Sequence, residues 1–459
     1  MKMNNDRKVP RILLGAAASG SGKTLVTCGF LQALKQRGLQ TASFKCGPDY
    51  IDPMFHSKII GTKSRNLDTF FASEEIVQYL LEKNSRDCEI SVIEGVMGYY
   101  DGLAGISEKA SAFDVAVKTK TPAVLIVNAK GMSVSVAAFI KGFLEYKENS
   151  WIRGVILNQV SPGIYPRLKK MIEEQLPVQV YGYVPNVEEC VLESRHLGLV
   201  MPEEIADLQE KLRKLAGILE ETLDIDGLLS LAQEAEALPI QPSAMSYHTE
   251  KPIRLALAKD EAFCFFYQDN LELLEEMGAQ LIPFSPIHDK TLPDQIDGLL
   301  LHGGYPELYA KELSENTSMR RSICEAIEKG LPYLAECGGF MYLHEQMEDM
   351  ENHRWPMAGV IAGAVYRTSR LCRFGYITLE EGTCFGKRVG KIPAHEFHYF
   401  ESENCGGDFL AQKPLSTRSW RCIHSDKQRI AGFPHLYYYG NLQVPEAFLR
   451  ACEERKRRQ

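Results

Sequence analysis

The stretch Gly-Ala-Ala-Ala-Ser-Gly-Ser-Gly-Lys-Thr at residues 15–24 decides the fold of the first half of the chain. It follows the apolar residues 11–16 and leads into residues 23–37, whose apolar positions have helical spacing. Strand, glycine loop and helix in this order are typical of a phosphate-binding loop, whose backbone N–H groups point at phosphate oxygens. We expect Lys23 to neutralise the β- and γ-phosphates of ATP and Thr24 to ligate Mg²⁺. The loop itself would be formed by Gly20, Ser21 and Gly22.

Short apolar segments alternate with helical segments along the rest of the first half. Strands are predicted at residues 41–45, 90–93, 123–128, 155–158 and 178–184, and helices between them, notably at 133–146 and 167–175. This alternation favours an α/β fold with a mostly parallel sheet covered on both faces.

In the phosphate loop, Ala17 stands where the strict pattern has glycine. The variant resembles the loop of dethiobiotin synthetase and its relatives.

Two polar residues end predicted strands of this sheet. Glu94 closes the buried segment Ile-Ser-Val-Ile-Glu, and its carboxylate is predicted to reach Mg²⁺ at the phosphate loop, because ligands of open α/β sheets bind at the carboxyl ends of the strands. Asn158 ends another strand and is predicted to contact the adenine.

Residues 45–56 read Lys-Cys-Gly-Pro-Asp-Tyr-Ile-Asp-Pro-Met-Phe-His, with two carboxylates between two prolines. Proline fixes φ and disfavours regular helix, so a stiff loop after the strand is predicted. Asp49 and Asp52 would then position a metal or substrate near the phosphate loop.

A domain boundary is predicted near residue 247. Residues 203–236 have helical periodicity, and residues 238–252 contain three prolines and no apolar period, which is typical of a linker. Residues 1–240 are therefore expected to form one domain and residues 252–459 a second α/β domain, with strands and helices again alternating.

A cysteine nucleophile is predicted in the second half. Cys337 follows the apolar residues 331–335 and precedes two glycines, a pattern typical of a strand-to-helix elbow that exposes a thiol and lowers its pKa. Gly303 and Gly304 follow an earlier strand and could form the oxyanion hole. The general base is expected later in the chain, with His435 as the first candidate and His395 and His398 as rivals.

The order of oxyanion glycines, cysteine elbow and late histidine resembles class I glutamine amidotransferase domains. In many of these a glutamate two residues after the histidine completes a triad, whereas Tyr437 stands there in this chain. The resemblance therefore implies a Cys–His dyad and leaves open what orients His435.

Taken together, the two halves resemble the cobyrinate a,c-diamide synthases, glutamine amidotransferases of the cobalamin pathway. The resemblance covers nearly the whole chain, and Pro-Asp-Tyr-Ile-Asp is its most specific element. The motifs that carry it are Ala-Ser-Gly-Ser-Gly-Lys-Thr at 18–24, Lys-Cys-Gly-Pro-Asp-Tyr-Ile-Asp-Pro at 45–53, Glu-Gly-Val-Met-Gly-Tyr-Tyr-Asp-Gly at 94–102, Ser-Arg-His-Leu-Gly-Leu at 194–199, Gly-Gly-Tyr-Pro-Glu at 303–307 and Ala-Glu-Cys-Gly-Gly-Phe-Met-Tyr-Leu at 335–343.

The resemblance implies that Cys337 and His435 hydrolyse L-glutamine and that ammonia passes internally to the first domain. There ATP and Mg²⁺ would convert corrinoid carboxylates into acyl phosphates, which ammonia then displaces. Arg195 and His196 could also face the corrinoid, a role that the resemblance itself does not assign.

Several alternatives remain open at this point. The macrocycle could be hydrogenobyrinate or nickel-sirohydrochlorin rather than cobyrinate, and residues 45–56 argue against a cobyric acid synthase. In a different class of function, the chain would be a nucleotide-driven switch fused to an inactive amidotransferase domain, against which the intact Cys337 and His435 count.

Composition excludes other classes of protein. The 459 residues have a formal net charge of -8, so no basic field attracts nucleic acid. Twelve cysteines without a Cys-x-x-Cys pair argue against zinc, and most are expected to be reduced and buried. No signal peptide or membrane-length apolar run is found, so we expect a cytoplasmic protein with no membrane partner. The oligomeric state, including a homodimer, stays open.

Overall fold

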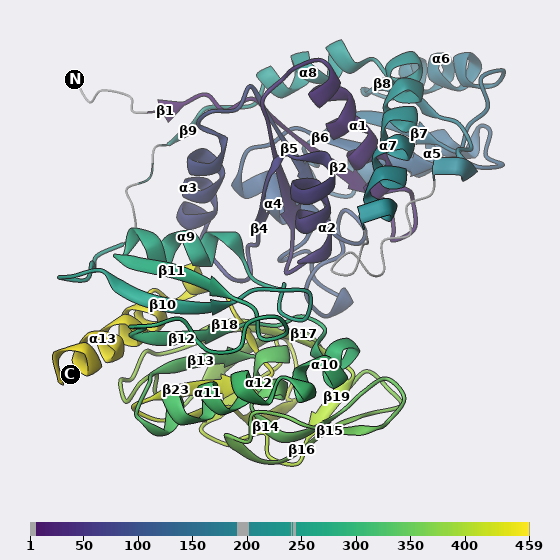
Figure 1. Ribbon diagram of the computed structural model, residues 1–459. Helices are drawn as coiled ribbons and strands as arrows, with labels where there is room; N and C mark the ends of the chain where they lie inside the picture. Colours follow the sequence, from purple (N-terminus) through teal and green to yellow (C-terminus); the bar gives the residue numbers. More distant parts are fainter. Residues whose placement is uncertain (1–5, 191–201, 240, 242–244, 459) are drawn as a thin grey trace, which may run out of the picture. The chain divides into compact units, whose positions relative to one another are not determined.

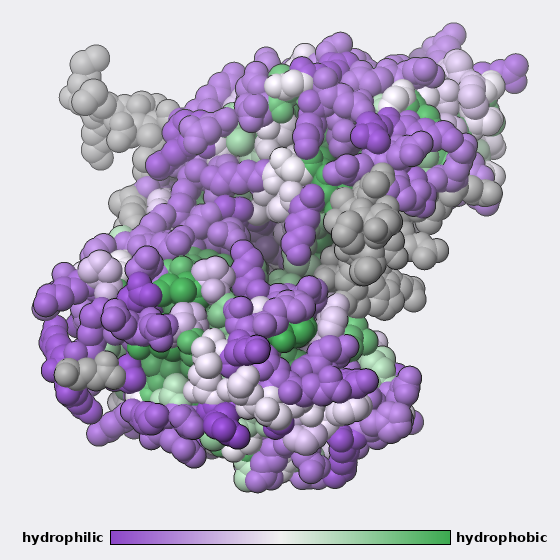
Figure 2. All heavy atoms as spheres, in the orientation of Figure 1, coloured by the Kyte–Doolittle hydropathy of each residue, from purple (hydrophilic) through white to green (hydrophobic). Residues whose placement is uncertain are grey.

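The chain folds into two units, residues 1–243 and residues 244–459. The computed structural model describes residues 6–190, 202–239, 241 and 245–458 (Figure 1). Hydrophilic residues cover most of the face of either unit that Figure 2 shows. None of the helices within the described ranges is both long and apolar enough to cross a membrane.

A seven-stranded parallel sheet organises the first unit, in the order β4-β3-β5-β2-β6-β7-β8. Its strands are β2 (Arg11–Ala16), β3 (Thr41–Cys46), β4 (Lys63–Leu67), β5 (Ile90–Glu94), β6 (Ala123–Asn128), β7 (Ile152–Asn158) and β8 (Gln179–Val184). The central strands are buried along their whole length, as expected where helices cover a parallel sheet.

Helices α1 (Lys23–Gln36), α7 (Pro202–Thr222) and α8 (Ile225–Gln233) share one apolar core with β2, β5 and β6. Close packing here depends on Gly29 of α1, because a Cβ at this position would lie 2.6 Å from a methyl carbon of Leu219 in α7. The unit also contains α3 (Glu74–Ser85), α4 (Ala112–Lys118), α5 (Ser135–Glu145) and α6 (Tyr165–Gln175).

The segment after β3 is helical, and the predicted stiff loop is wrong here. It forms the short helix α2 (Ile51–Phe55) and a turn of π-helix, η1 (His56–Ile60). Pro53 is tolerated because it lies in the first turn, where the backbone N–H has no helical partner to lose. Two residues before the helix, the Asp49 carboxylate accepts hydrogen bonds from the N–H groups of Ile51 (2.8 Å) and Asp52 (3.2 Å).

The two ends of the first unit are tied together. The fully buried Arg11 guanidinium donates to the carbonyls of Val9, Thr119 and Lys120 and, at 2.7 Å, to that of Glu236. Beside it, β1 (Asp6–Arg7) pairs antiparallel with β9 (Leu238–Pro239).

The second unit is built on a six-stranded sheet with the order β11-β10-β12-β13-β23-β22. Its strands are β10 (Ile253–Ala258), β11 (Ala279–Phe284), β12 (Gly298–Leu301), β13 (Tyr333–Glu336), β22 (His424–Ser425) and β23 (Arg429–Gly432). All pairs are parallel except that of β22 with β23. Its helices are α9 (Gln268–Glu276), α10 (Ala310–Glu315), α11 (Thr317–Glu328), α12 (Gly338–Tyr342) and α13 (Gln443–Arg458).

Two further sheets of the second unit lie in the sequence between β13 and α13. One has the order β15-β14-β16-β19 and the other β21-β20-β17-β18-β24. Their strands are β14 (His344–Glu348), β15 (Arg354–Pro356), β16 (Ile361–Arg367), β17 (Arg373–Glu380), β18 (Ile392–His398), β19 (Phe400–Ser402), β20 (Phe409–Gln412), β21 (Ser419–Cys422) and β24 (His435–Leu436). The strand β18 brings its histidines to β24, where His395 pairs with His435.

Candidate active sites

The phosphate loop turns on two glycines in the left-handed region, Gly20 (φ 78°) and Gly22 (φ 89°). Gly22 is the residue before α1, so the N–H groups of the first helical turn have no partner within the helix and are available to a phosphate. A Cβ on Gly22 would lie 2.2 Å from the side-chain nitrogen of Asn158. Glycine is therefore required at position 22 both for its backbone conformation and for this close approach.

Asn158 braces the loop from the end of β7. Its side-chain NH₂ group donates to the carbonyl of Ser21 at 2.8 Å, and its side-chain oxygen accepts from the N–H of Gln159 at 2.9 Å. The amide is 3% exposed. These contacts give Asn158 a role in shaping the loop, whereas its predicted contact with adenine stays a prediction.

Lys23 lies at the start of α1 with little exposure. Its Nζ donates to the carbonyl of Met97 at 2.8 Å. Burial and the neighbouring Lys45 lower the pKa of Lys23 to about 8. The ammonium is therefore charged at neutral pH but holds its proton less tightly than an exposed lysine.

Glu94 is the centre of a buried polar cluster beside the loop. One of its carboxylate oxygens, Oε1, accepts from the Thr24 hydroxyl at 2.7 Å and from Lys45 Nζ at 2.9 Å. The other oxygen, Oε2, lies 3.4 Å from Nε2 of His56. Burial alone would raise the pKa of Glu94, but Lys45 and His56 together bring it well below its usual range. Glu94 is therefore a buried carboxylate that is compensated by a buried cation.

Asp52 joins this cluster from α2. Its carboxylate lies 2.5 Å from Lys45 Nζ. Burial and the neighbouring Glu94 raise the pKa of Asp52 to about 6 in spite of that lysine.

Lys45 and His56 are functional candidates that sequence reasoning missed. The signal was present, because Lys45 is the one charged residue of a fully buried strand and pairs in register with Glu94.

The polar groups at the loop suit Mg²⁺. The Thr24 hydroxyl and the Glu94 carboxylate offer two hard oxygen ligands, which this ion prefers. Within the described part of the chain, no three His, Cys, Asp or Glu side chains could hold a metal by themselves. The remaining ligands would therefore be phosphate oxygens and water, as is usual for Mg²⁺ at a nucleotide.

Cys337 occupies a strained elbow between β13 and α12, with φ 44° and ψ −105°. The two glycines that follow make the elbow possible. A Cβ on Gly339 would lie 2.0 Å from the carbonyl oxygen of Leu301, and one on Gly338 would lie 3.1 Å from the backbone nitrogen of Gly304. The elbow is therefore pressed against the end of β12, and the backbone nitrogen of Gly304, a predicted oxyanion-hole donor, lies beside it.

The environment of Cys337 corrects the expectation of a lowered thiol pKa. Burial and the carboxylates of Glu307, Glu396 and Glu336 raise the pKa of Cys337. The short helix α12 does not outweigh these effects. The resting side chain is therefore a neutral thiol that needs a base to take its proton.

His435 is buried and neutral. Burial and the neighbouring His395, His302 and His398 hold the pKa of His435 well below its usual value. Its ring stacks on that of His395, with centroids 4.8 Å apart and planes inclined by 17°. Gly303 lies against the same ring, since a Cβ there would be 2.6 Å from Cε1 of His435.

Glu336, the residue before Cys337, faces His435 and was missed by sequence reasoning. Its Oε2 lies 3.9 Å from Nδ1 of His435 and 3.5 Å from Nδ1 of His302, and its Oε1 accepts from the N–H of Leu436 at 3.3 Å. The residue is 3% exposed. A buried carboxylate directly before the nucleophile could have been noticed as a charge that ends an apolar strand.

Tyr437, which stands where the triad glutamate would be, has its hydroxyl engaged by another residue. Its hydroxyl donates to Asp269 at 3.4 Å, and its ring packs edge-on against Tyr267. His398, a rival of His435, stacks on Phe433 at 4.0 Å and is hydrogen-bonded elsewhere. Arg195 and His196, with the rest of residues 194–199, lie outside the described residues.

Comparison with known proteins agrees with this geometry. Residues 12–199 match the CobQ/CobB/MinD/ParA nucleotide binding domain, and residues 254–432 match the CobB/CobQ-like glutamine amidotransferase domain. The chain is 40% identical over 447 residues to the cobyrinate a,c-diamide synthase of Caldanaerobacter subterraneus subsp. tengcongensis, with 96% of this chain and 98% of that relative covered. The chain belongs to the cobyrinate a,c-diamide synthase family.

Other members of this family align over almost their whole length. The cobyrinate a,c-diamide synthase of Listeria innocua is 42% identical, with 94% of this chain and 97% of the relative covered. That of Priestia megaterium is 34% identical, with 97% and 98% covered. The predicted class of enzyme, an ATP-dependent ligase with a nucleotide-binding and a glutamine amidotransferase domain, is confirmed, as is the α/β fold of both domains. The amidotransferase match ends at residue 432, before His435.

Proposed function

We propose that this protein amidates the a and c side-chain carboxylates of cobyrinate, using ATP and ammonia released from L-glutamine, in cobalamin biosynthesis. The observation that carries the proposal is the presence in one chain of a compensated charge cluster at a phosphate loop and a strained cysteine elbow with a buried histidine. The names of the relatives supply the macrocycle.

In the amidotransferase domain, Cys337 attacks the side-chain carbonyl of glutamine. His435 takes the thiol proton through Nε2, because its Nδ1 faces the Glu336 carboxylate. Glu336 favours the imidazolium that results and holds the Leu436 backbone in place. The N–H groups of Gly303 and Gly304 stabilise the oxyanion. His435 then returns the proton to the departing ammonia, and water hydrolyses the thioester.

In the nucleotide-binding domain, a carboxylate oxygen of the corrinoid attacks the γ-phosphorus of ATP and ADP leaves. Ammonia then attacks the acyl carbon and phosphate departs. Lys23, with Lys45 behind it, supplies positive charge to the transferred phosphoryl group. Asp52, which forms an ion pair with Lys45, positions the substrate. Asp49 shapes the helical turn on which Asp52 lies. Mg²⁺, held by Thr24 and Glu94, would supply further neutralisation of the phosphates.

We assign residues 1–240 to the synthase reaction and residues 252–459 to glutamine hydrolysis. We also propose that the reaction takes place in the cytoplasm. All twelve cysteines are free, which suits a reducing compartment that contains ATP.

One experiment tests the proposal directly. The purified protein is incubated with ATP, Mg²⁺, glutamine and, in separate reactions, cobyrinate, hydrogenobyrinate or nickel-sirohydrochlorin, and the amide groups are counted by mass spectrometry. We expect two amides on cobyrinate and slower or no reaction with the other macrocycles. Preference for another macrocycle would overturn the substrate assignment, and ATP turnover without any amide product would favour the nucleotide-driven switch instead.

A further inference from the structure

The strand β18 carries two buried histidines, and one of them stacks on the ring of His435. His395 stands directly opposite His435 in the antiparallel pair of β18 and β24. Side chains opposite each other in such a pair lie on the same face of the sheet. The planes of the two rings are inclined by only 17°. Strand register therefore fixes this stack, because a slip of one residue would turn the His395 side chain to the other face.

The ring of His395 is itself held in place. Its Nδ1 lies 3.3 Å from the hydroxyl oxygen of Tyr267, whose ring also meets the imidazole edge-on. Tyr267 is buried and directly precedes α9. Burial, with Lys413 nearby, lowers the pKa of His395 to about 3, so the ring is neutral at physiological pH. His435 therefore meets a neutral aromatic face that is anchored to a helix.

The backbone around His435 is fixed by separate contacts. The side chain of Asn270, in α9, donates to the carbonyl of Leu436 at 2.8 Å and accepts from the N–H of Tyr438 at 2.8 Å. The carbonyl of Gly432, three residues before His435, accepts from the N–H of Cys337 at 2.9 Å. With the main chain held on both sides, the orientation of His435 depends on the rotation of its ring about the Cβ–Cγ bond.

Two further neighbours of the His435 ring meet its edge. Oε2 of Glu336 lies 3.9 Å from Nδ1, which is longer than a hydrogen bond. A Cβ on Gly303 would lie 2.6 Å from Cε1 and 3.5 Å from Nδ1. These contacts border two adjacent ring atoms and do not oppose a turn of the ring out of its plane. The face supplied by His395 opposes that turn.

We propose that His395 is a positioning residue for glutamine hydrolysis, whose ring face sets the plane of the His435 imidazole and so directs the nitrogen that takes the thiol proton. The inference rests on the role of His435 proposed above. Proton transfer needs the base within hydrogen-bond reach of the proton, and a displacement of about 1 Å at a catalytic group can lower the rate about 10²-fold. His395 would thus share the orienting role of the triad glutamate that Tyr437 replaces.

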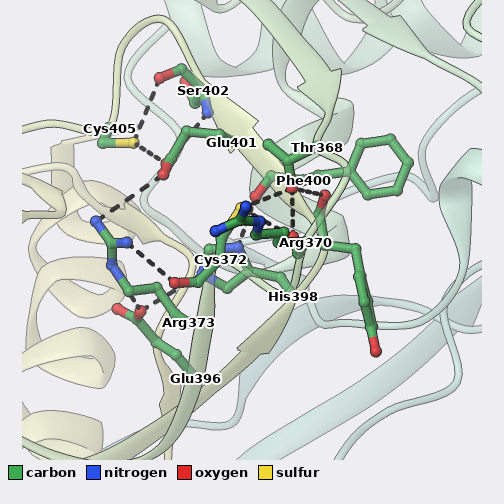
Figure 3. Close-up of polar contacts among 11 residues, drawn as sticks. Thr368, Arg370, Cys372, Arg373, Glu396, His398, Phe400, Glu401, Ser402 and Cys405 are labelled. Carbon is green, nitrogen blue, oxygen red and sulfur yellow. Dashed lines mark hydrogen bonds and ion pairs between the residues drawn. The ribbon is translucent and has the colours of Figure 1, made fainter.

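His398, three residues further along β18, offers a matched comparison (Figure 3). Its Nδ1 lies 2.6 Å from the carbonyl oxygen of Phe400, and its Nε2 lies 3.4 Å from the Glu396 carboxylate. Its ring stacks on Phe433. His395 and His398 are 4% and 5% exposed. The same substitution at either position therefore separates the loss of the stack on His435 from the loss of a buried histidine.

The first test measures glutamate formed from glutamine by the full-length protein and its variants. In His395→Leu, we expect kcat to fall about 10- to 100-fold and KM for glutamine to change less than about threefold. His395→Phe supplies a flat ring again and should return kcat to within about fivefold of wild type. His398→Leu should stay closer to wild type than His395→Leu. An unchanged kcat in His395→Leu, no recovery in His395→Phe, or an equal loss in His398→Leu would overturn the proposal.

A second measurement does not depend on turnover. Iodoacetamide at pH 7 alkylates Cys337 as its thiolate, and mass spectrometry of the peptides gives the rate, with the partly exposed Cys324 as internal reference. This rate should fall in His395→Leu about as much as kcat and recover in His395→Phe, while that of Cys324 stays the same. An unchanged rate at Cys337 would overturn the proposal.

Should His395→Leu fail to fold, Tyr267→Phe decides instead. It removes one hydroxyl and leaves both histidines in place, and it should slow the alkylation of Cys337 about threefold, because the His395 ring is no longer anchored. An unchanged rate in Tyr267→Phe would then overturn the proposal. A wild-type protein that forms no glutamate would contradict the proposed function, whereas the alkylation rates would still decide whether His395 orients the base.

Discussion

The two catalytic regions treat buried charge in opposite ways. At the phosphate loop, Glu94 and Asp52 keep their place in the interior because Lys45 lies within 3 Å of both. At the cysteine elbow, the two reacting groups, Cys337 and His435, are buried as neutral groups beside the Glu336 carboxylate. The first region is prepared for a substrate that brings its own charge, and the second for a reaction that creates charge only in the transition state.

The largest effect should come from removing the nucleophile. In Cys337→Ala, we expect glutamine-dependent amidation to fall at least about 10³-fold, because no other group can form the thioester. Amidation with added ammonium chloride should stay within about twofold of wild type. The two rates are measured side by side by mass spectrometry of the corrinoid product. Loss of the ammonia-supported rate would contradict the separation of the two chemistries.

Removing the buried cation should damage the first region in a different way. In Lys45→Met, Glu94 and Asp52 lose their partner, and we expect the free energy of unfolding of this unit to drop by about 3–5 kcal/mol. Hydrogen exchange of peptides from β3 and β5 measures this in the nucleotide-binding domain alone. The double variant Lys45→Met with Glu94→Gln should recover part of the loss, and a double variant no more stable than the single one would contradict charge compensation.

Glu336→Gln sharpens the comparison, because it removes a charge and little volume. We expect the kcat of glutamine hydrolysis to fall about 10- to 100-fold with a small change in KM, since the imidazolium of His435 is less favoured. The pH dependence of kcat should shift, and ammonia-supported amidation should not change. His302→Gln, which alters the other neighbour of the same carboxylate, is the control and should have the smaller effect. An unchanged pH profile in Glu336→Gln would leave Glu336 a purely structural role.

The smallest expected effect concerns pH and the nucleotide. Because the pKa of Lys23 is lowered to about 8, the ammonium loses its proton as pH rises through that value, and the attraction for phosphate weakens. ATP affinity, measured by isothermal titration, should fall by at most about tenfold per pH unit above 8. Lys23→Arg stays protonated and should show no such decline even if it binds ATP more weakly. A flat profile in the wild type would contradict the lowered pKa.

Much of the first unit could be predicted because its signals are local. The strand at Ala123–Asn128 and the helix that begins at Lys23 follow from apolar periodicity and a glycine loop. The edge strand Lys63–Leu67 could not be found this way, since Lys-Ser-Arg-Asn-Leu has no apolar run and pairs only with β3. In the second unit, most strands after Cys337 are short and belong to sheets whose partners are distant in sequence.

The sequence predicted which residue types form the site, but not their protonation or their hydrogen-bond partners. Sequence indicated Cys337 and His435 as a pair, yet the direction of the thiol pKa depends on burial and on Glu307 and Glu396, which only folding brings near, as well as on the adjacent Glu336. Asn158 was placed at the correct strand end, but its amide is occupied by the loop backbone. Asp49 proved to accept hydrogen bonds from the first turn of a helix that proline had argued against.

The guanidinium of Arg11 has a practical consequence for anyone who wishes to produce the nucleotide-binding domain alone. Because it holds the carbonyl of Glu236, a protein truncated before that residue would leave a buried cation short of an acceptor, and the antiparallel pair of β1 with β9 would also be lost. An expression vector for this domain should therefore encode the chain through at least Pro239, and the natural place for a protease site is the proline-rich segment that follows.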